Sequence, residues 1–158
     1  MQTTHKLQQC LDALGQATGA RYALEANGWS TLRFDNATEI TVGADEALGL
    51  IFMLAPVCSL TDSSRARLMQ DALEMALLGL GTGGCILGYD RANDQLMLSV
   101  SRPHAALDGP YFVNAFSQFV DVVLRLKNAF QQAQGNTQVH AGAAVVPADV
   151  PRHEFMRV

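Results

Sequence analysis

Residues 79–86 read GLGTGGCI, and the spacing of Gly79, Gly81 and Gly84 matches the dinucleotide-binding pattern G-x-G-x-x-G. That pattern binds a pyrophosphate where glycines follow a strand and begin a helix, because the free N–H groups of the first helical turn face the phosphates. Here the run before the glycines, from Ser64 to Leu80, predicts a helix, and CILGYD after them predicts a strand. A helix C-terminus presents carbonyl groups, which repel phosphate. The order therefore argues against a nucleotide site.

The same glycines have a structural explanation. Gly79 or Gly81 can adopt the left-handed conformation that ends a helix, and Gly83 and Gly84 let the backbone turn sharply. Thr61, Asp62 and Ser63 offer N-caps for the preceding helix. Its apolar face is wider than one contact with a sheet requires, which indicates a surplus of apolar surface; it comprises Leu68, Met69, Ala72, Leu73, Ala76, Leu77 and Leu80.

Toward the C-terminus, QLMLSVSRP predicts a further strand, joined to CILGYD by a polar turn at residues 91–94. Asp108, Gly109 and Pro110 predict the start of a third helix, which Gly135-Asn136 would end. The inner side of this helix is expected to consist of Phe112, Phe116, Phe119, Val120, Val123, Leu126 and Phe130.

Toward the N-terminus, LGLIFMLAPV (48–57) is apolar on both faces and predicts a central strand, or one that a second subunit covers. WSTLRFD and TEITVG alternate between apolar and polar residues, as half-buried strands do. RYALEAN (21–27) alternates in the same way, and Asn27-Gly28 is a strong hairpin signal. Before them, the spacing of Leu7, Leu11 and Leu14 predicts the first helix.

These segments predict an α+β fold in which three helices pack on a twisted antiparallel sheet of five or six strands, in the order α-β-β-β-α-β-β-α. The sixth strand would be RYALEAN. Residues 1–134 are expected to form a single domain, and residues 135–158 a flexible C-terminal tail.

Composition narrows the function. The 158 residues are 49% hydrophobic and 16% charged, with a net charge of -4, so no basic face is available for nucleic acid. The apolar run at 48–57 is too short to cross a bilayer, and the first ten residues lack the apolar run of a signal peptide. Cys10, Cys58 and Cys85 lack metal-ligand spacing and are expected to be buried thiols in a reducing cytoplasm.

Catalytic patterns give no positive signal. The sequence contains neither HExxH nor GxSxG, and its four histidines, His5, His104, His140 and His153, lie near an end, beside a proline or in the tail. We therefore expect no enzyme activity, no cofactor and no metal. Folding could still assemble an acid–base pair, so a small α+β enzyme or ligand-binding domain remains the alternative.

The layout resembles the type III secretion chaperones of the Tir chaperone (CesT-like) family over about residues 5–132. The residues that carry the resemblance are LGQATGARYALEANG, TLRFDN, EITV, GLIFMLAPV, LTDSSRARL, GLGTGGCILGYD and QLMLSVSRP. The resemblance implies a cytoplasmic bacterial homodimer that binds the N-terminal region of a secreted effector, keeping it extended and secretion-competent without ATP. The secretion ATPase is a further candidate partner, and a regulatory subunit of the secretion apparatus is a further alternative function.

The resemblance also suggests sites. In the family, the second helix and the following strand form the subunit contact, which here implies Leu73, Leu77, Leu80, Ile86 and Leu87. For effector binding, the first helix and the strands after it imply Leu7, Leu11, Leu14, Leu32, Phe34, Ile40 and Val42. About half of the second set is expected to be plain core, because a sheet face must be covered by helices in any case.

Overall fold

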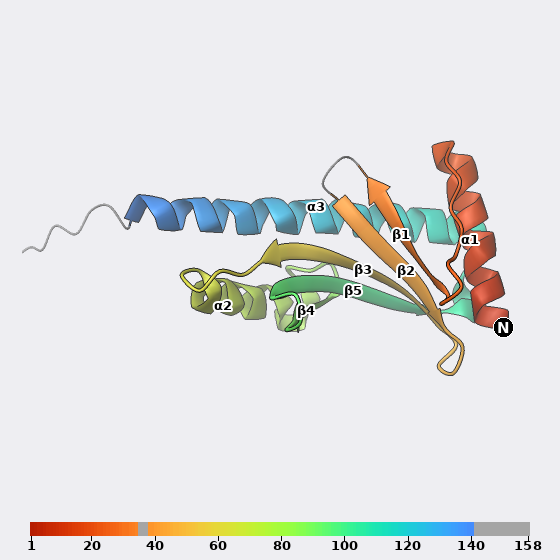
Figure 1. Ribbon diagram of the computed structural model, residues 1–158, viewed down its shortest axis with the longest axis horizontal. Coiled ribbons are helices and arrows are strands. Elements are labelled where there is room, and N and C mark those ends of the chain that lie inside the picture. Colours follow the sequence, from red (N-terminus) through yellow and green to blue (C-terminus); the bar gives the residue numbers. More distant parts are fainter. Residues whose placement is uncertain (35–37, 141–158) are drawn as a thin grey trace, which may run out of the picture.

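The computed structural model describes residues 1–34 and 38–140, with the backbone alone for 136–140. Figure 1 shows the arrangement of its helices and strands. The elements in order are α1 (Gln2–Thr18), β1 (Trp29–Phe34), β2 (Thr38–Asp45), β3 (Leu50–Ser59), α2 (Arg65–Ala76), the 3-10 turn η1 (Leu77–Gly79), β4 (Ile86–Asp90), β5 (Gln95–Pro103), the 3-10 turn η2 (His104–Ala106) and α3 (Gly109–His140). The predicted α+β class and the order α-β-β-β-α-β-β-α are confirmed.

The described strands form one twisted sheet in the order β1-β2-β3-β5-β4, with every neighbouring pair antiparallel. The sheet has five strands. The strand β3 lies in its centre, which explains the apolar run that continues on both of its faces. Its predicted central place is therefore confirmed.

The two faces of the sheet differ in what covers them. Register aligns Val42, Met53 and Val100 across β2, β3 and β5, and all three are buried. We call this the inner face; α1 contacts it at β2 and α3 contacts it at β3. On the opposite, outer face, Trp29, Phe52 and Leu54 are only half-buried. The hydrophobic core therefore lies between one face of the sheet and the two helices.

The helix α3 supplies most of the aromatic core. Six of its seven predicted inner residues are buried, and Val120 is partly buried against the core. The Asp108 carboxylate accepts a hydrogen bond from the Tyr111 backbone N–H at 2.7 Å, so Asp108 caps the first turn as the sequence indicated. In α1, Leu7, Leu11 and Leu14 form the predicted buried stripe.

One predicted strand is absent. Residues 21–27, RYALEAN, form no strand in the described chain. Instead the Gln8 side chain of α1 donates to the Tyr22 carbonyl and accepts from the Leu24 N–H, each at 3.2 Å. A side-chain amide thus takes the backbone groups that a neighbouring strand would have paired. The alternation of Tyr22 and Leu24 reflects packing against the core, where both are partly buried.

Two helix boundaries also differ from prediction. The N-cap of α2 is Ser64, which makes no side-chain capping bond, and the Arg65 N–H bonds to the Thr61 carbonyl. The helix α3 continues through Gly135 to His140, because a single glycine costs a helix only about 1 kcal/mol relative to alanine. Of the predicted tail, residues 141–158 lie outside the described residues. Within the described ranges, no helix has the length and apolarity needed to cross a membrane.

The three cysteines are free thiols. Cys10 and Cys58 are buried as expected, whereas Cys85 is half-buried. Burial raises the pKa of all three, so they remain protonated at neutral pH and are poor nucleophiles.

Candidate partner-binding surface

The helix α2 buries little of its apolar surface. Of its 12 residues, only Leu68 and Ala72 are buried, and they face the inner side of the sheet near its edge strand β4. Five large apolar side chains that follow Ala72 are exposed, whereas Met75 packs against the core. Their exposed fractions are 72% for Leu73, 67% for Leu77, 85% for Leu78, 81% for Leu80 and 66% for Ile86. We call these five residues the α2–β4 surface.

A break in the helix creates much of this exposure. The helix α2 ends at Ala76, and η1 follows with Leu78 at φ 56° and Gly79 at φ 68°. A left-handed leucine is unusual because its Cβ crowds the following carbonyl. Since the chain reverses here, Leu77 and Leu80 leave the helical stripe that the sequence predicted, and they lie exposed together with Leu78.

The glycine-rich loop fixes this reversal. The fully buried Thr82 donates its hydroxyl to the Cys85 carbonyl at 2.6 Å, and the Gly84 N–H bonds to the Gly79 carbonyl at 3.0 Å. A Cβ on Gly81 would lie 2.8 Å from the Met75 carbonyl oxygen, so only glycine fits there. Gly83 and Gly84 both have positive φ. The predicted structural role of GLGTGGCI is confirmed.

The residues predicted for the dimer contact are mostly at the surface. Leu73, Leu77, Leu80 and Ile86 are exposed, so they are not intramolecular core. Leu87 differs, because strand alternation turns it to the inner face beside Leu98, where it packs against the core. Sequence reasoning missed Leu78, because a helix continued to Leu80 places it off the apolar stripe; no sequence signal marked the helix break at that residue.

The residues predicted for effector binding are mostly core, and this assignment is corrected. Six of the seven are 0–3% exposed: Leu7, Leu11, Leu14, Leu32, Ile40 and Val42. They are buried because the inner face of the sheet is covered by α1 and α3 of the same chain. Phe34 is half-buried, with its ring 5.2 Å from that of Phe116.

Other features of the described chain offer little chemistry. It contains no group of three His, Cys, Asp or Glu side chains that could hold a metal ion. A cavity of about 210 Å³ lies between α3 and β5, with Arg102, Tyr111, Asn114 and Gln118 among its lining residues. It is smaller than typical ligand pockets, which span roughly 300–1,000 Å³. This cavity therefore gives weak support to the alternative of a ligand-binding domain.

Comparisons with solved structures place the fold. A chain of the HopA1–SchA chaperone–effector complex is 17% identical, with 81% of this chain and 98% of that chain covered at a TM-score of 0.67. A chain of the ExsC–ExsE complex is 16% identical, with 79% and 93% covered at 0.64. The structure of the Yersinia pestis type III secretion chaperone SycH with a fragment of YscM2 matches at 15% identity, with 75% and 98% covered at 0.57.

No curated protein matches this chain by sequence. The sequence model of the Tir chaperone protein (CesT) family, in contrast, matches residues 9–127, which extend from α1 into α3. That match covers most of the chain and includes every strand of the sheet. The chain therefore belongs to the Tir chaperone protein (CesT) family of type III secretion chaperones.

Proposed function

We propose that this protein is a cytoplasmic, homodimeric chaperone that binds the N-terminal region of one or more secreted effectors. It keeps that region extended, soluble and secretion-competent, and it acts by binding alone, without ATP hydrolysis or another enzymatic step. The observation that carries the proposal is the α2–β4 surface, which this chain leaves uncovered. The family of the chain and the chaperone–effector complexes that share its fold support an effector as partner.

The α2–β4 surface supports the homodimer. Burial of one leucine or isoleucine side chain contributes roughly 1.5–3 kcal/mol, so several such residues in one contact favour association strongly. Ile86 lies on the edge strand β4, which α2 contacts and at which the backbone of the sheet also ends. A second copy that packs there covers apolar side chains and a strand edge together. The net charge of -4 helps to keep such a dimer soluble.

The outer face of the sheet supports the effector site. Trp29, Phe52 and Leu54 are half-buried there, and register places Trp29 and Phe52 on either side of Gly43. The adjacent strand β1 is the other edge of the described sheet. An extended effector segment can pair its backbone with β1 and lay alternate apolar side chains across this face. This surface replaces the buried residues that sequence reasoning had assigned.

Light scattering tests the dimer. The wild type is expected to have a mass of about 34 kDa in solution, twice the 17.0 kDa of one chain. The variants Leu73→Lys and Leu77→Lys are expected to have the mass of one chain, 17.0 kDa, and an unchanged circular dichroism spectrum. Leu48→Lys is the matched control, because Leu48 is 65% exposed but lies in the β2–β3 turn. A monomeric wild type, or a Leu77→Lys dimer, contradicts the proposed contact.

Coexpression tests the effector site. N-terminal segments of secreted proteins encoded beside the chaperone gene serve as probes, and retention on the immobilised dimer is measured. Trp29→Ser is expected to reduce retention, whereas Arg33→Ser, on the same strand and face, is not. If the wild type retains no secreted segment, the chaperone proposal fails; if both variants retain it equally, only the outer-face site fails.

A further inference from the structure

The helix α2 is held by few buried apolar side chains, since only Leu68 and Ala72 of the helix are buried. A hollow of about 110 Å³ opens between the helix residues Met69, Leu73 and Ala76 and the strand residues Leu87 and Leu96. Side chains that line this hollow lack packing partners on one side, so they fix the orientation of the helix weakly. Contacts of another kind must determine the direction in which α2 presents Leu73 and Leu77.

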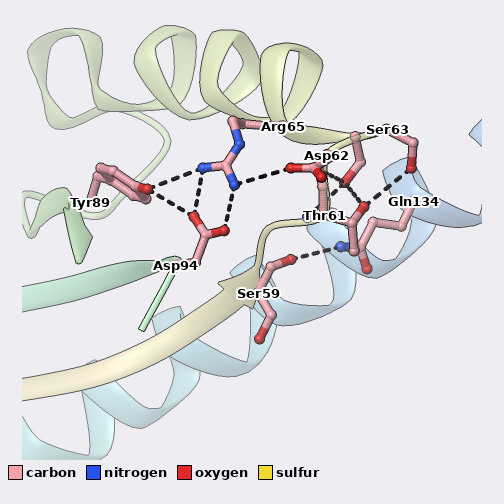
Figure 2. A network of polar contacts seen from close by, with 9 residues as sticks. Ser59, Thr61, Asp62, Ser63, Arg65, Tyr89, Asp94 and Gln134 are labelled. Carbon is pink, nitrogen blue, oxygen red and sulfur yellow. Dashed lines mark hydrogen bonds and ion pairs between the residues drawn. The ribbon is translucent and has the colours of Figure 1, made fainter. Parts of the chain in front are cut away.

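Polar contacts hold the first turn of the helix. The Arg65 guanidinium donates to both carboxylate oxygens of Asp94, at 2.6 Å from Nη1 to Oδ1 and at a shorter distance from Nη2 to Oδ2. The Tyr89 hydroxyl accepts from Arg65 at 3.1 Å and donates to Asp94 at 2.8 Å. Figure 2 shows the three side chains directed toward one another from α2, β4 and the β4–β5 turn. Each member thus contacts both others.

The acceptor of this clamp is itself anchored. Asp94 has φ 53°, a left-handed conformation that Asp tolerates better than most residues, and its carbonyl accepts the Leu60 N–H at 2.9 Å. The carboxylate therefore belongs to a turn that is bonded to the chain leaving β3. Asp62, 3.7 Å from Arg65, adds a second carboxylate on the other side of the guanidinium.

The opposite end of the helix has a weaker counterpart. Arg125 of α3 donates to the Gly81 carbonyl at 3.2 Å, and the Gly81 N–H bonds to the Met75 carbonyl at 3.1 Å. Polar contacts therefore hold α2 near both ends, while the exposed leucines lie between them or beside the second. Of these two contacts, the one at Arg65 is an ion pair, and the one at Arg125 is a hydrogen bond to a backbone carbonyl.

We propose that Arg65, Asp94 and Tyr89 form a positioning clamp that sets the orientation of α2, and thereby the geometry in which Leu73 and Leu77 meet the second copy. This inference rests on the proposed dimer. Arg65 and Asp94 are 36% and 41% exposed, where a simple ion pair contributes little. The two-oxygen contact and the shared hydroxyl strengthen it and fix its direction. The clamp acts through geometry and contacts no partner.

The test separates orientation from stability. The variants are Arg65→Gln, Tyr89→Phe and Asp94→Asn, the last chosen because Asn also tolerates positive φ. Arg33→Gln is the control, since it breaks the exposed 2.8 Å pair with Glu39 at the far edge of the sheet. Sedimentation equilibrium gives the dimer dissociation constant, and hydrogen exchange gives the protection of residues 66–76 and of the central strands.

We expect Arg65→Gln and Asp94→Asn to raise the dissociation constant about 3- to 10-fold, because the leucines then meet the second copy in a less well-defined geometry. Faster exchange should appear in α2 and not in β3 or β5. Tyr89→Phe should raise the dissociation constant less, and Arg33→Gln should leave it unchanged. Arg65→Lys should bind more tightly than Arg65→Gln, because lysine returns one charged donor.

Three outcomes overturn the clamp. These are unchanged α2 exchange and affinity in Arg65→Gln, equal loss of protection across the whole sheet, and no difference between Arg65→Lys and Arg65→Gln. The Leu77→Lys variant judges the dimer surface separately. If the wild type is a monomer, the proposed dimer fails, and the exchange of α2 still decides whether the clamp holds the helix.

Discussion

The regions around α3 and α2 contain similar apolar residues and use them in opposite ways. The helix α3 buries Phe112, Phe116 and Phe130 against the inner face of the sheet, each at 2% exposure or less. The segment from α2 to β4 leaves Leu73 and Leu78 exposed at 72% and 85%. Since the same chain can cover apolar side chains in one place, their exposure in the other supports the proposed contact with a second copy.

The largest expected effect compares one leucine from each region. Leu7→Ala should lower the free energy of unfolding by about 2–5 kcal/mol, because Leu7 is fully buried in the core. Leu77→Ala should change it by less than about 0.5 kcal/mol, because Leu77 is exposed. Urea denaturation in the Leu73→Lys background keeps dimer formation out of the measurement. Equal losses would show that the α2 region is folded as tightly as the core.

A pair of sheet glycines extends the comparison to the backbone. A Cβ on Gly43 would lie 2.1 Å from the Trp29 ring, so Gly43→Ala should displace the indole and cost about 1–3 kcal/mol. A Cβ on Gly88 of β4 meets nothing within 4 Å, so Gly88→Ala should be nearly neutral. Trp29 is the only tryptophan, and its fluorescence reports the displacement directly. An unshifted Gly43→Ala spectrum would contradict the contact.

A smaller, stabilising effect is expected at the helix break. Leu78 has φ 56°, and glycine adopts this conformation without the Cβ clash, so Leu78→Gly should raise the stability of the monomer by up to about 1 kcal/mol. The same change should weaken the dimer, because an exposed leucine is lost. Calorimetry and light scattering measure the two effects. A less stable monomer would mean that Leu78 packs within its own chain.

The smallest effect concerns pH at the clamp. The Arg65 guanidinium, and then the Tyr89 hydroxyl, lower the pKa of Asp94 from its ordinary 3.8. The folded pKa lies below the unfolded one, so the contribution is complete above 3.8 and is lost as pH falls through the folded value. Between about pH 5 and about pH 2, the wild-type melting temperature should fall slightly more steeply than that of Asp94→Asn.

The comparison between the two variants is needed because other carboxylates titrate in the same range. The pKa of Asp90 in the same turn is lowered by hydrogen bonds from Asn93 and Gln95. Asp90 remains in Asp94→Asn, so its contribution cancels in the difference. Parallel curves would show that Asp94 is not stabilised in its charged form.

Local patterns predicted most of the elements. The alternation in TEITVG and the phenylalanine spacing of α3 were reliable, because strand and helix periods depend on neighbouring residues alone. RYALEAN shows that alternation of apolar and polar residues does not by itself make a strand. Its alternation was real, but the partner that took its backbone groups was the Gln8 side chain, 14 and 16 residues away in sequence. Gly135 was misjudged for a related reason, since one glycine does not end a helix.

Site prediction depended more on three-dimensional contacts. Leu7 and Leu73 look alike in the sequence, since each lies on the apolar stripe of a predicted helix. Leu7 is 0% exposed and Leu73 is 72% exposed. The difference arises because α1 and α3 cover the inner face at β2 and β3, whereas α2 contacts the edge strand β4. The effector-binding residues chosen from the sequence were therefore mostly core, whereas four of the five dimer residues are exposed.

By itself, the sequence determined the order of helices and strands, the structural role of the glycines and the presence of surplus apolar surface. Those properties follow from local periodicity, backbone sterics and composition. Only the tertiary structure decided which leucines form that surplus. The physical reason is that exposure depends on the chain reversal at Leu78 and Gly79 and on which helices cover the inner face of the sheet, and neither is specified by a local pattern.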